Sequence, residues 1–239
     1  MLRTFRKLVF TGILLSFIPL ADAAERLTVV ELFTSQGCSS CPPADGLLGD
    51  LAVRPEVLAL SEHIDYWDYL GWHDPFALAD NTRRQRSYAR RLGQSYVYTP
   101  QFVVHGVVQS PGKDRLSLLH LIKEAEAQPA RVSVEIETHD EGALAARLAA
   151  AALPKPADVW LVKFDPAHVT AIANGENEGR SIRNVNVVRA FTLIGRWSGE
   201  PASLSLPKIY PSDSAYAVLV QETDAGPILG ATRLPAPMR

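Results

Sequence analysis

The chain holds two cysteines, separated by two serines in the segment Cys38-Ser39-Ser40-Cys41. The apolar run before them, 27–33, is typical of a buried strand, and the segment after them, 42–53, begins with two prolines and is typical of a helix. A cysteine pair with this spacing, between a strand and a helix, suits reversible dithiol–disulfide chemistry. Backbone N–H groups and the helix dipole would favour a thiolate at Cys38, and Cys41 could then resolve a mixed disulfide. The alternative is a structural staple, although so short a loop adds little stability.

The first 23 residues have the features of a secretory signal peptide. A basic start within 3–7 precedes the apolar stretch 8–20, and Ala21-Asp22-Ala23 is a small-x-small cleavage site. The apolar stretch is too short for a membrane-spanning helix. We therefore expect cleavage before Ala24 and a periplasmic or secreted mature protein without a membrane span.

The overall composition is that of an ordinary globular protein. The 239 residues carry a formal net charge of -2, and 47% of them are hydrophobic, so no basic excess indicates nucleic-acid binding. The one dense basic segment, Arg83-Arg84-Gln85-Arg86, is interpreted as a solvated helical face rather than an anion-binding patch.

The first half of the chain alternates strands and helices. After the cysteine helix, the pattern predicts a buried strand at 56–65, a tryptophan-containing loop at 66–75, a helix at 76–92, a hairpin at 99–109 and a helix at 113–128. Asp74 is the expected N-cap of the second helix, followed by a proline at its first position.

The second half has a different residue pattern, in which apolar and polar residues alternate with period two and prolines are frequent. Strands are predicted at 131–137, 143–152, 158–165, 168–173, 183–197, 215–222 and 228–234. These strands indicate an antiparallel β-sandwich-like domain with no cysteine and no evident catalytic constellation. The polar loop Gly175–Arg180 is expected to dock on the first domain, where it could restrict access to Cys38; a ligand loop is the alternative.

Several strings together resemble a bacterial secreted thioredoxin-like family of unknown function. They are VELFTSQGCSSCPPAD at 30–45, HIDYWDYLGW at 63–72, YTPQ at 98–101, GENEGR at 175–180 and NVVR at 186–189. The resemblance implies a thioredoxin-like α/β N-terminal domain, export and a CSSC motif. With the strand pattern, it predicts a signal peptide at 1–23, a thioredoxin-like domain at 24–129 and an all-β C-terminal domain at 130–239. It also implies a cis-proline facing the cysteines, at Pro100.

The motif differs from that of ordinary thioredoxins in two ways. Gly37, not tryptophan, precedes Cys38, which leaves that side of the sulfur open. The residues between the cysteines are serines, whose hydroxyls could donate hydrogen bonds to a thiolate and lower the pKa of its thiol.

Five residues outside the motif are candidate helpers. Glu31, inside the apolar first strand, could exchange protons with the second cysteine, or it could make only a structural hydrogen bond. His63 and Asp65 alternate at the end of the second strand and could pair near the sulfurs or anchor the following loop. Trp67 and Trp72 could wall a substrate groove or pack as core.

These residues predict a periplasmic thiol–disulfide oxidoreductase that needs no cofactor beyond a redox-active Cys38–Cys41 disulfide. Cys38 would exchange with a protein or small-molecule thiol or disulfide, and Thr99 with Pro100 would hold the substrate backbone. A second hypothesis is a copper-handling protein that binds Cu(I) through both cysteines and His63 or His105. A third is a non-catalytic binding module with an inert disulfide.

Overall fold

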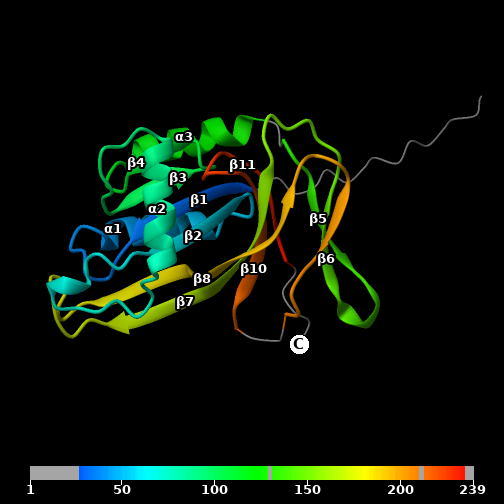
Figure 1. Cartoon of the computed structure of the whole chain (residues 1–239). Coiled ribbons are helices and arrows are strands. Elements are labelled where there is room, and N and C mark those ends of the chain that lie inside the picture. The colour runs from blue at the N-terminus through cyan, green and yellow to red at the C-terminus, as the bar shows by residue number, and fades with distance from the viewer. Residues whose placement is uncertain (1–26, 129–130, 210–212, 235–239) are drawn as a thin grey trace, which may run out of the picture.

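The computed structural model describes residues 27–128, 131–209 and 213–234 (Figure 1). The predicted signal peptide and the predicted domain boundary at 129/130 lie outside these described residues. Within them, three α-helices are present: α1 (Pro42–Ala52), α2 (Ala79–Arg91) and α3 (Arg115–Ala127). No helix in this described part is long and apolar enough to cross a membrane.

Eight strands form one mixed sheet in the order β11-β10-β7-β8-β2-β1-β3-β4. They are β1 (Thr28–Thr34), β2 (Val57–His63), β3 (Gln101–Val104), β4 (Val108–Pro111), β7 (Ala157–Ala171), β8 (Ser181–Trp197), β10 (Ala215–Glu222) and β11 (Ile228–Arg233). A smaller sheet, in the order β5-β6-β9, contains β5 (Val134–Thr138), β6 (Leu144–Leu148) and β9 (Ala202–Ser205).

The helices cover the part of the large sheet that holds β1 and β2. Both strands are buried along their whole length and pair in parallel, as expected for strands covered on both faces. One core joins α1 and α3 to the sheet through Leu48, Ile122 and Leu32, whereas Tyr88 of α2 packs on Phe33, which alternates to the other face. A separate core lies between the small sheet and the part of the large sheet that holds Val159 of β7, Trp197 of β8 and Val220 of β10. The small sheet stands apart from the helices in Figure 1.

The predicted fold class, a thioredoxin-like α/β domain followed by an all-β sandwich-like domain, is wrong. The long hairpin of β7 and β8 joins the first sheet directly, because β8 pairs in parallel with β2 at Ser61 and Val187. The chain is therefore mostly β, with one large mixed sheet built from both halves. Period-two alternation identified most strands of the second half but missed β9, and it could not specify which strands they pair with.

Individual elements were predicted more closely than their assembly. The cysteine helix begins at Pro42, the segment at 143–152 contains β6, and β10 spans Ala215–Glu222 as predicted. The two strands expected around Pro166 are one continuous strand, β7. Asp74 does not cap α2, whose N-cap is Leu78.

A buried ion cluster joins α2 to the sheet. Arg84 Nε lies 2.6 Å from Glu31 Oε1, and the Tyr88 hydroxyl donates to Glu31 Oε2 at 2.6 Å. Arg84 also lies 3.5 Å from Glu62 and donates to Gln221 of β10 at 3.0 Å. Burial and the neighbouring Glu31 raise the pKa of Glu62 well above its usual range. The predicted solvated face is thus wrong for Arg84, because α2 turns this residue toward the sheet.

Replacing Arg84 with methionine should destabilise the protein by about 3–5 kcal/mol, since it leaves the buried carboxyl groups of Glu31 and Glu62 without their cation. The adjacent variant Arg83→Met is the matched control. Arg83 is 67% exposed and pairs with Asp80 on its own helix, so its loss should cost less than about 1 kcal/mol. Urea unfolding at neutral pH compares the two variants, and equal losses would contradict the role assigned to the cluster.

Candidate functional site

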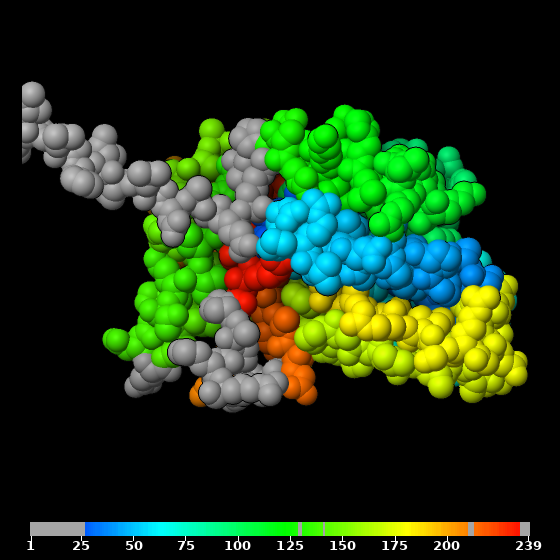
Figure 2. All heavy atoms as spheres, turned by 180° about the vertical axis from the view of Figure 1, so that it is seen from behind, coloured from blue at the N-terminus to red at the C-terminus, as the bar shows by residue number. Residues whose placement is uncertain are grey.

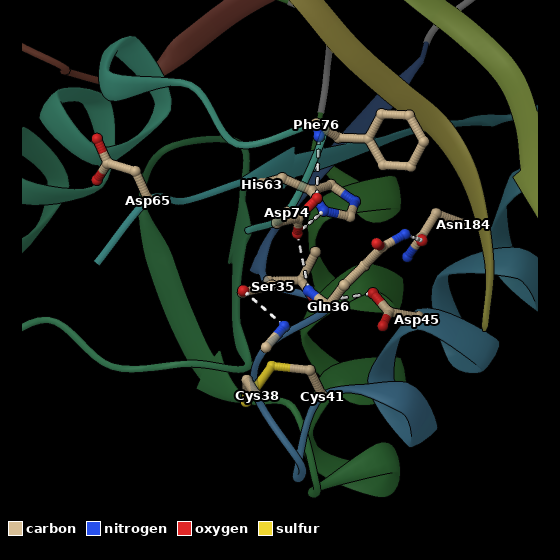
Figure 3. Close-up of polar contacts among 12 residues, drawn as sticks. Ser35, Gln36, Cys38, Cys41, Asp45, His63, Asp65, Asp74, Phe76 and Asn184 are labelled. Carbon is tan, nitrogen blue, oxygen red and sulfur yellow. Dashed lines mark hydrogen bonds and ion pairs between the residues drawn. A yellow bond between two sulfur atoms is a disulfide. The ribbon is translucent and has the colours of Figure 1, made fainter. Parts of the chain in front are cut away.

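The two cysteines form a disulfide in the turn between β1 and α1 (Figure 3). Their Cα atoms lie 5.4 Å apart, and Cys41 is the N-cap of α1. Cys38 is 3% exposed and Cys41 is fully buried, whereas Ser39 and Ser40 between them are exposed. Both cysteines are thus buried, and the small exposure that remains belongs to Cys38.

Few backbone N–H groups remain near Cys38. Pro42 and Pro43, the first two residues of α1, have none, and the Cys41 N–H donates to the Cys38 carbonyl at 3.1 Å. The helix start is thus poorer in donors than the sequence suggested. A side chain provides the nearest polar contact instead, since Ser40 Oγ lies 3.3 Å from Cys38 Sγ. This contact agrees with the prediction that a serine of the motif can donate to the sulfur.

The loop between β7 and β8 docks on the cysteine turn, as predicted. Asn177 is buried, and its Nδ2 group donates to the carbonyl groups of Gln36 and Cys38, at 2.9 Å each. The adjacent Glu176 accepts a hydrogen bond from the Ser39 N–H at 3.1 Å. Figure 2 shows the yellow β7–β8 region lying against the blue segment that follows β1.

Thr99 and Pro100 are joined by a cis peptide bond, as the family resemblance implied. Pro100 lies close to the cysteine helix, because a Cβ atom on Gly112 would come within 2.6 Å of the Pro100 ring and 2.9 Å of Ala44. Only glycine fits this approach of β4 to α1. The Gly112 N–H also donates to the Pro100 carbonyl at 2.9 Å.

Both candidate tryptophans lie next to the cysteine turn and are half-buried. The Trp67 indole donates to Thr99 Oγ1 at 2.7 Å. Trp67 also packs against Gly37, because a Cβ atom added to this glycine would be in van der Waals contact with the Trp67 Cβ. The Trp72 indole donates to the Gln36 side chain at 3.1 Å. The loop at 66–75 therefore connects the cysteine turn to Thr99 and Pro100.

His63 and Asp65 do not pair with each other. His63 Nδ1 lies 2.7 Å from Asp74 Oδ2, and Asp65 accepts from the Thr82 hydroxyl at 2.7 Å. The strand β2 ends at His63, so the alternation that would have placed both side chains on one face stops there. His63 thus bonds to Asp74 in the tryptophan loop, whereas Asp65 bonds to Thr82 of α2, so neither prediction for a His63–Asp65 pair describes this arrangement.

Glu31 does not serve the cysteines in this structure. Both of its carboxylate oxygens are bonded within the ion cluster, to Arg84 and Tyr88. Its position inside β1 turns it toward α2, and this arrangement agrees with the alternative of a structural hydrogen bond.

The acidic residue near the cysteines is Asp45, which the sequence analysis did not single out. It follows Cys41 by four residues, so the two lie on neighbouring turns of the same helix face. This spacing is a signal that sequence reasoning could have used. Asp45 Oδ1 accepts from the Thr34 hydroxyl at 2.8 Å, and the Asn184 side chain also lies close enough to lower the pKa of Asp45.

A buried polar layer surrounds Asp45 on the interior side of the disulfide (Figure 3). Burial raises the pKa of Asp45 to about 6, although the nearby His63 opposes the shift. Burial also opposes the ionisation of Asp74, but His63 and the N–H groups of Gln36 and Phe76 outweigh it and lower the pKa of Asp74. The layer thus contains an imidazole and two carboxyl groups of different acidity.

The described residues contain no cluster of three or more histidine, cysteine or acidic side chains that could hold a metal ion. His63, the proposed third Cu(I) ligand, is fully buried and directs Nδ1 to Asp74. A cavity of about 300 Å³ lies elsewhere, between α2 and the strands β7, β8 and β10, with Arg84, Trp160 and Phe191 in its wall. It shares no lining residue with the cysteine turn.

Comparison with known proteins places the sequence in one family. Residues 29–221 match the family described as protein of unknown function, DUF1223. No curated protein matches the chain.

Two solved structures are similar to this one. A crystal structure of an Agrobacterium tumefaciens protein from a structural genomics programme is 32% identical, with a TM-score of 0.77, and the match covers 91% of this chain and 98% of that one. HBP35 of Porphyromonas gingivalis is 14% identical, with a TM-score of 0.57, over 90% of this chain and 76% of that one, and so shares only the fold.

The raised pKa of Asp45 predicts a pH-dependent stability difference between the oxidised protein and its Asp45→Asn variant. Between the ordinary aspartate pKa of 3.8 and about 6, the folded state binds more protons than the unfolded state. The stability contributed by Asp45 therefore falls as pH rises through this window and is constant above it. Relative to the wild type, the free energy of unfolding of the variant should rise by about 2 kcal/mol between pH 4 and pH 7.

Urea unfolding at several pH values measures this difference. Asp50→Asn is the matched control, because Asp50 lies on the same helix with a side chain that is 63% exposed. Its profile should run parallel to that of the wild type. A parallel profile for Asp45→Asn as well would show that Asp45 is not held as a buried acid.

Proposed function

The chain belongs to DUF1223, a family of unknown function, and from this premise we propose that it is a thiol–disulfide oxidoreductase that acts through Cys38 and Cys41. The proposal includes a periplasmic or secreted location, which the basic and then apolar start of the sequence supports. The partner would be a protein or a small molecule that carries a thiol or a disulfide.

The observation that carries the proposal is the asymmetry of the cysteine pair. The two residues are bonded to each other, yet only Cys38 has any exposed surface. Exchange through a mixed disulfide requires one sulfur that a partner can reach and a second thiol that resolves the intermediate, and Cys38, at 3% exposure, is the more accessible of the two. The Ser40 hydroxyl, 3.3 Å from Cys38 Sγ, would donate to a thiolate formed there.

In the reducing direction, the Cys38 thiolate attacks a disulfide of the partner. The partner's S–S bond breaks, a mixed disulfide forms, and the departing partner sulfur takes up a proton from water. Cys41 then loses its proton and attacks Cys38 Sγ, which releases the second partner sulfur as a thiolate. The partner gains two electrons, and the protein is left with the Cys38–Cys41 disulfide. The oxidising direction is the reverse sequence.

We assign Asp45 as the acceptor of the Cys41 proton. It lies one helical turn beyond Cys41 and is buried on the interior side of the disulfide. A carboxyl group with a pKa near 6 can both take and return a proton at neutral pH. The proposal thereby gives Asp45 the role that the sequence analysis assigned to Glu31.

The partner would dock on Thr99, Pro100 and the neighbouring Trp67. Thr99 and Trp67 are half-buried and are bonded to each other, and Pro100 is buried beside them. The Pro100 carbonyl is already bonded to Gly112, so the backbone of Thr99, the residue before the proline, would pair with an extended substrate.

The reduced wild-type protein should catalyse the reduction of insulin by dithiothreitol, and the Cys38→Ala variant should leave only the uncatalysed rate. Cys41→Ala should also lose turnover, because its mixed disulfide is not resolved. Circular dichroism of each variant checks that it is folded. Wild-type protein without exchange activity, or Cys38→Ala with full activity, would refute the proposed function.

A further inference from the structure

We propose that the Glu176 carboxylate makes the reduction potential of the Cys38–Cys41 pair more negative. It does so by holding a negative charge beside Cys38 and by accepting a hydrogen bond from the Ser39 N–H. This charge makes the reduced form less stable and keeps the pair a stronger reductant. The inference rests on the proposed function, since it assigns a tuning residue to the same cysteines.

The first argument is the small number of donors at this turn. The Ser39 N–H is bonded to Glu176, and the Cys41 N–H is bonded to the Cys38 carbonyl. Pro42 and Pro43 contribute no N–H. A thiolate at Cys38 must therefore compete with the carboxylate for the Ser39 N–H, and the Ser40 hydroxyl is a side-chain donor within reach of it.

The second argument is that the loop holds Glu176 in place. Its neighbour Asn177 is buried and makes two hydrogen bonds to the cysteine turn, while Arg180 donates to the Asn177 side chain at 3.0 Å. Gly175, on the other side of Glu176, has a φ of 82°. It packs against the tryptophan loop so closely that a Cβ atom added to it would lie 3.2 Å from the Leu70 carbonyl oxygen. A larger residue at Gly175 would be strained and crowded.

The third argument is electrostatic. The hydrogen bonds from Ser39 lower the pKa of Glu176, which is fully exposed and hence ionised at neutral pH. A like charge beside a thiolate disfavours it and raises the pKa of its thiol. A couple whose reduced form is less stabilised has a more negative potential. The other charged groups around the turn, Arg180 in the loop and Asp45, His63 and Asp74 behind the disulfide, are unchanged by substitutions at Glu176.

The test is the Glu176→Gln variant, which removes the charge but keeps an acceptor for Ser39. The pKa of Cys38 in the reduced protein should fall by about half a unit, a roughly threefold change in the thiol–thiolate equilibrium. The midpoint potential in glutathione buffers should become less negative. Both differences from wild type should shrink in 1 M salt, because an exposed charge is screened.

Glu178→Gln is the matched control, because Glu178 is exposed in the same loop and has no hydrogen bond or ion pair to the cysteine turn. It should leave both quantities at the wild-type values. Ser40→Ala should move the pKa of Cys38 in the opposite direction, upward, by removing the hydroxyl donor. The pKa is read from the pH dependence of alkylation at Cys38, followed by mass spectrometry.

Unchanged pKa and potential in Glu176→Gln would overturn the proposal and leave Glu176 as a loop anchor only. Equal shifts in Glu176→Gln and Glu178→Gln would also overturn it, since the effect would then belong to the net charge of the loop. Neither measurement uses a protein substrate. A wild-type protein that fails to reduce insulin would therefore refute the proposed function without deciding the role of Glu176.

Discussion

One side-chain amide fixes the shape of the cysteine turn. Asn177 Nδ2 donates to the carbonyl groups of Gln36 and Cys38, which lie on either side of Gly37. Because Asn177 belongs to the loop between β7 and β8, this bond depends on the parallel pairing of β8 with β2. The large mixed sheet thus has a direct consequence for the sulfur atoms, since it brings a distant loop within hydrogen-bond reach of the residue that a partner would attack.

The disulfide lies between two charged environments. On its interior side are Asp45, His63 and Asp74, all buried, and the hydrogen bonds of Gln36 connect this layer to Asn184 of β8 and to Trp72. On its outer side is the exposed carboxylate of Glu176. In the proposed mechanism, Asp45 takes the proton of the buried Cys41, and the charge of Glu176 acts on Cys38. This division suits a pair in which one cysteine attacks and the other resolves.

Local features of the site could be predicted from the sequence, and long-range partners could not. The cysteine turn, the helix that starts at Pro42 and the cis bond before Pro100 followed from short motifs and from the family resemblance. The partner of His63 did not, because Asp74 reaches it from a loop whose path is set by Thr82 and Asn81 of α2.

The burial of Arg84 and its bond to Glu31 likewise depend on how α2 packs on the sheet. The fold class failed for the same physical reason. Alternation shows which face of a strand is buried, but the choice of neighbouring strand is made by contacts between segments more than a hundred residues apart, such as Ser61 and Val187.

The central claim, that Cys38 is the accessible nucleophile and Cys41 the resolving thiol, can be tested with glutathione disulfide as a defined probe. The reduced Cys41→Ala protein should form a stable mixed disulfide with glutathione at Cys38, seen by mass spectrometry and reversed by reductant. The reduced Cys38→Ala protein should react far more slowly, because Cys41 is fully buried. Equal reaction of both variants, or no adduct at Cys38, would contradict the account.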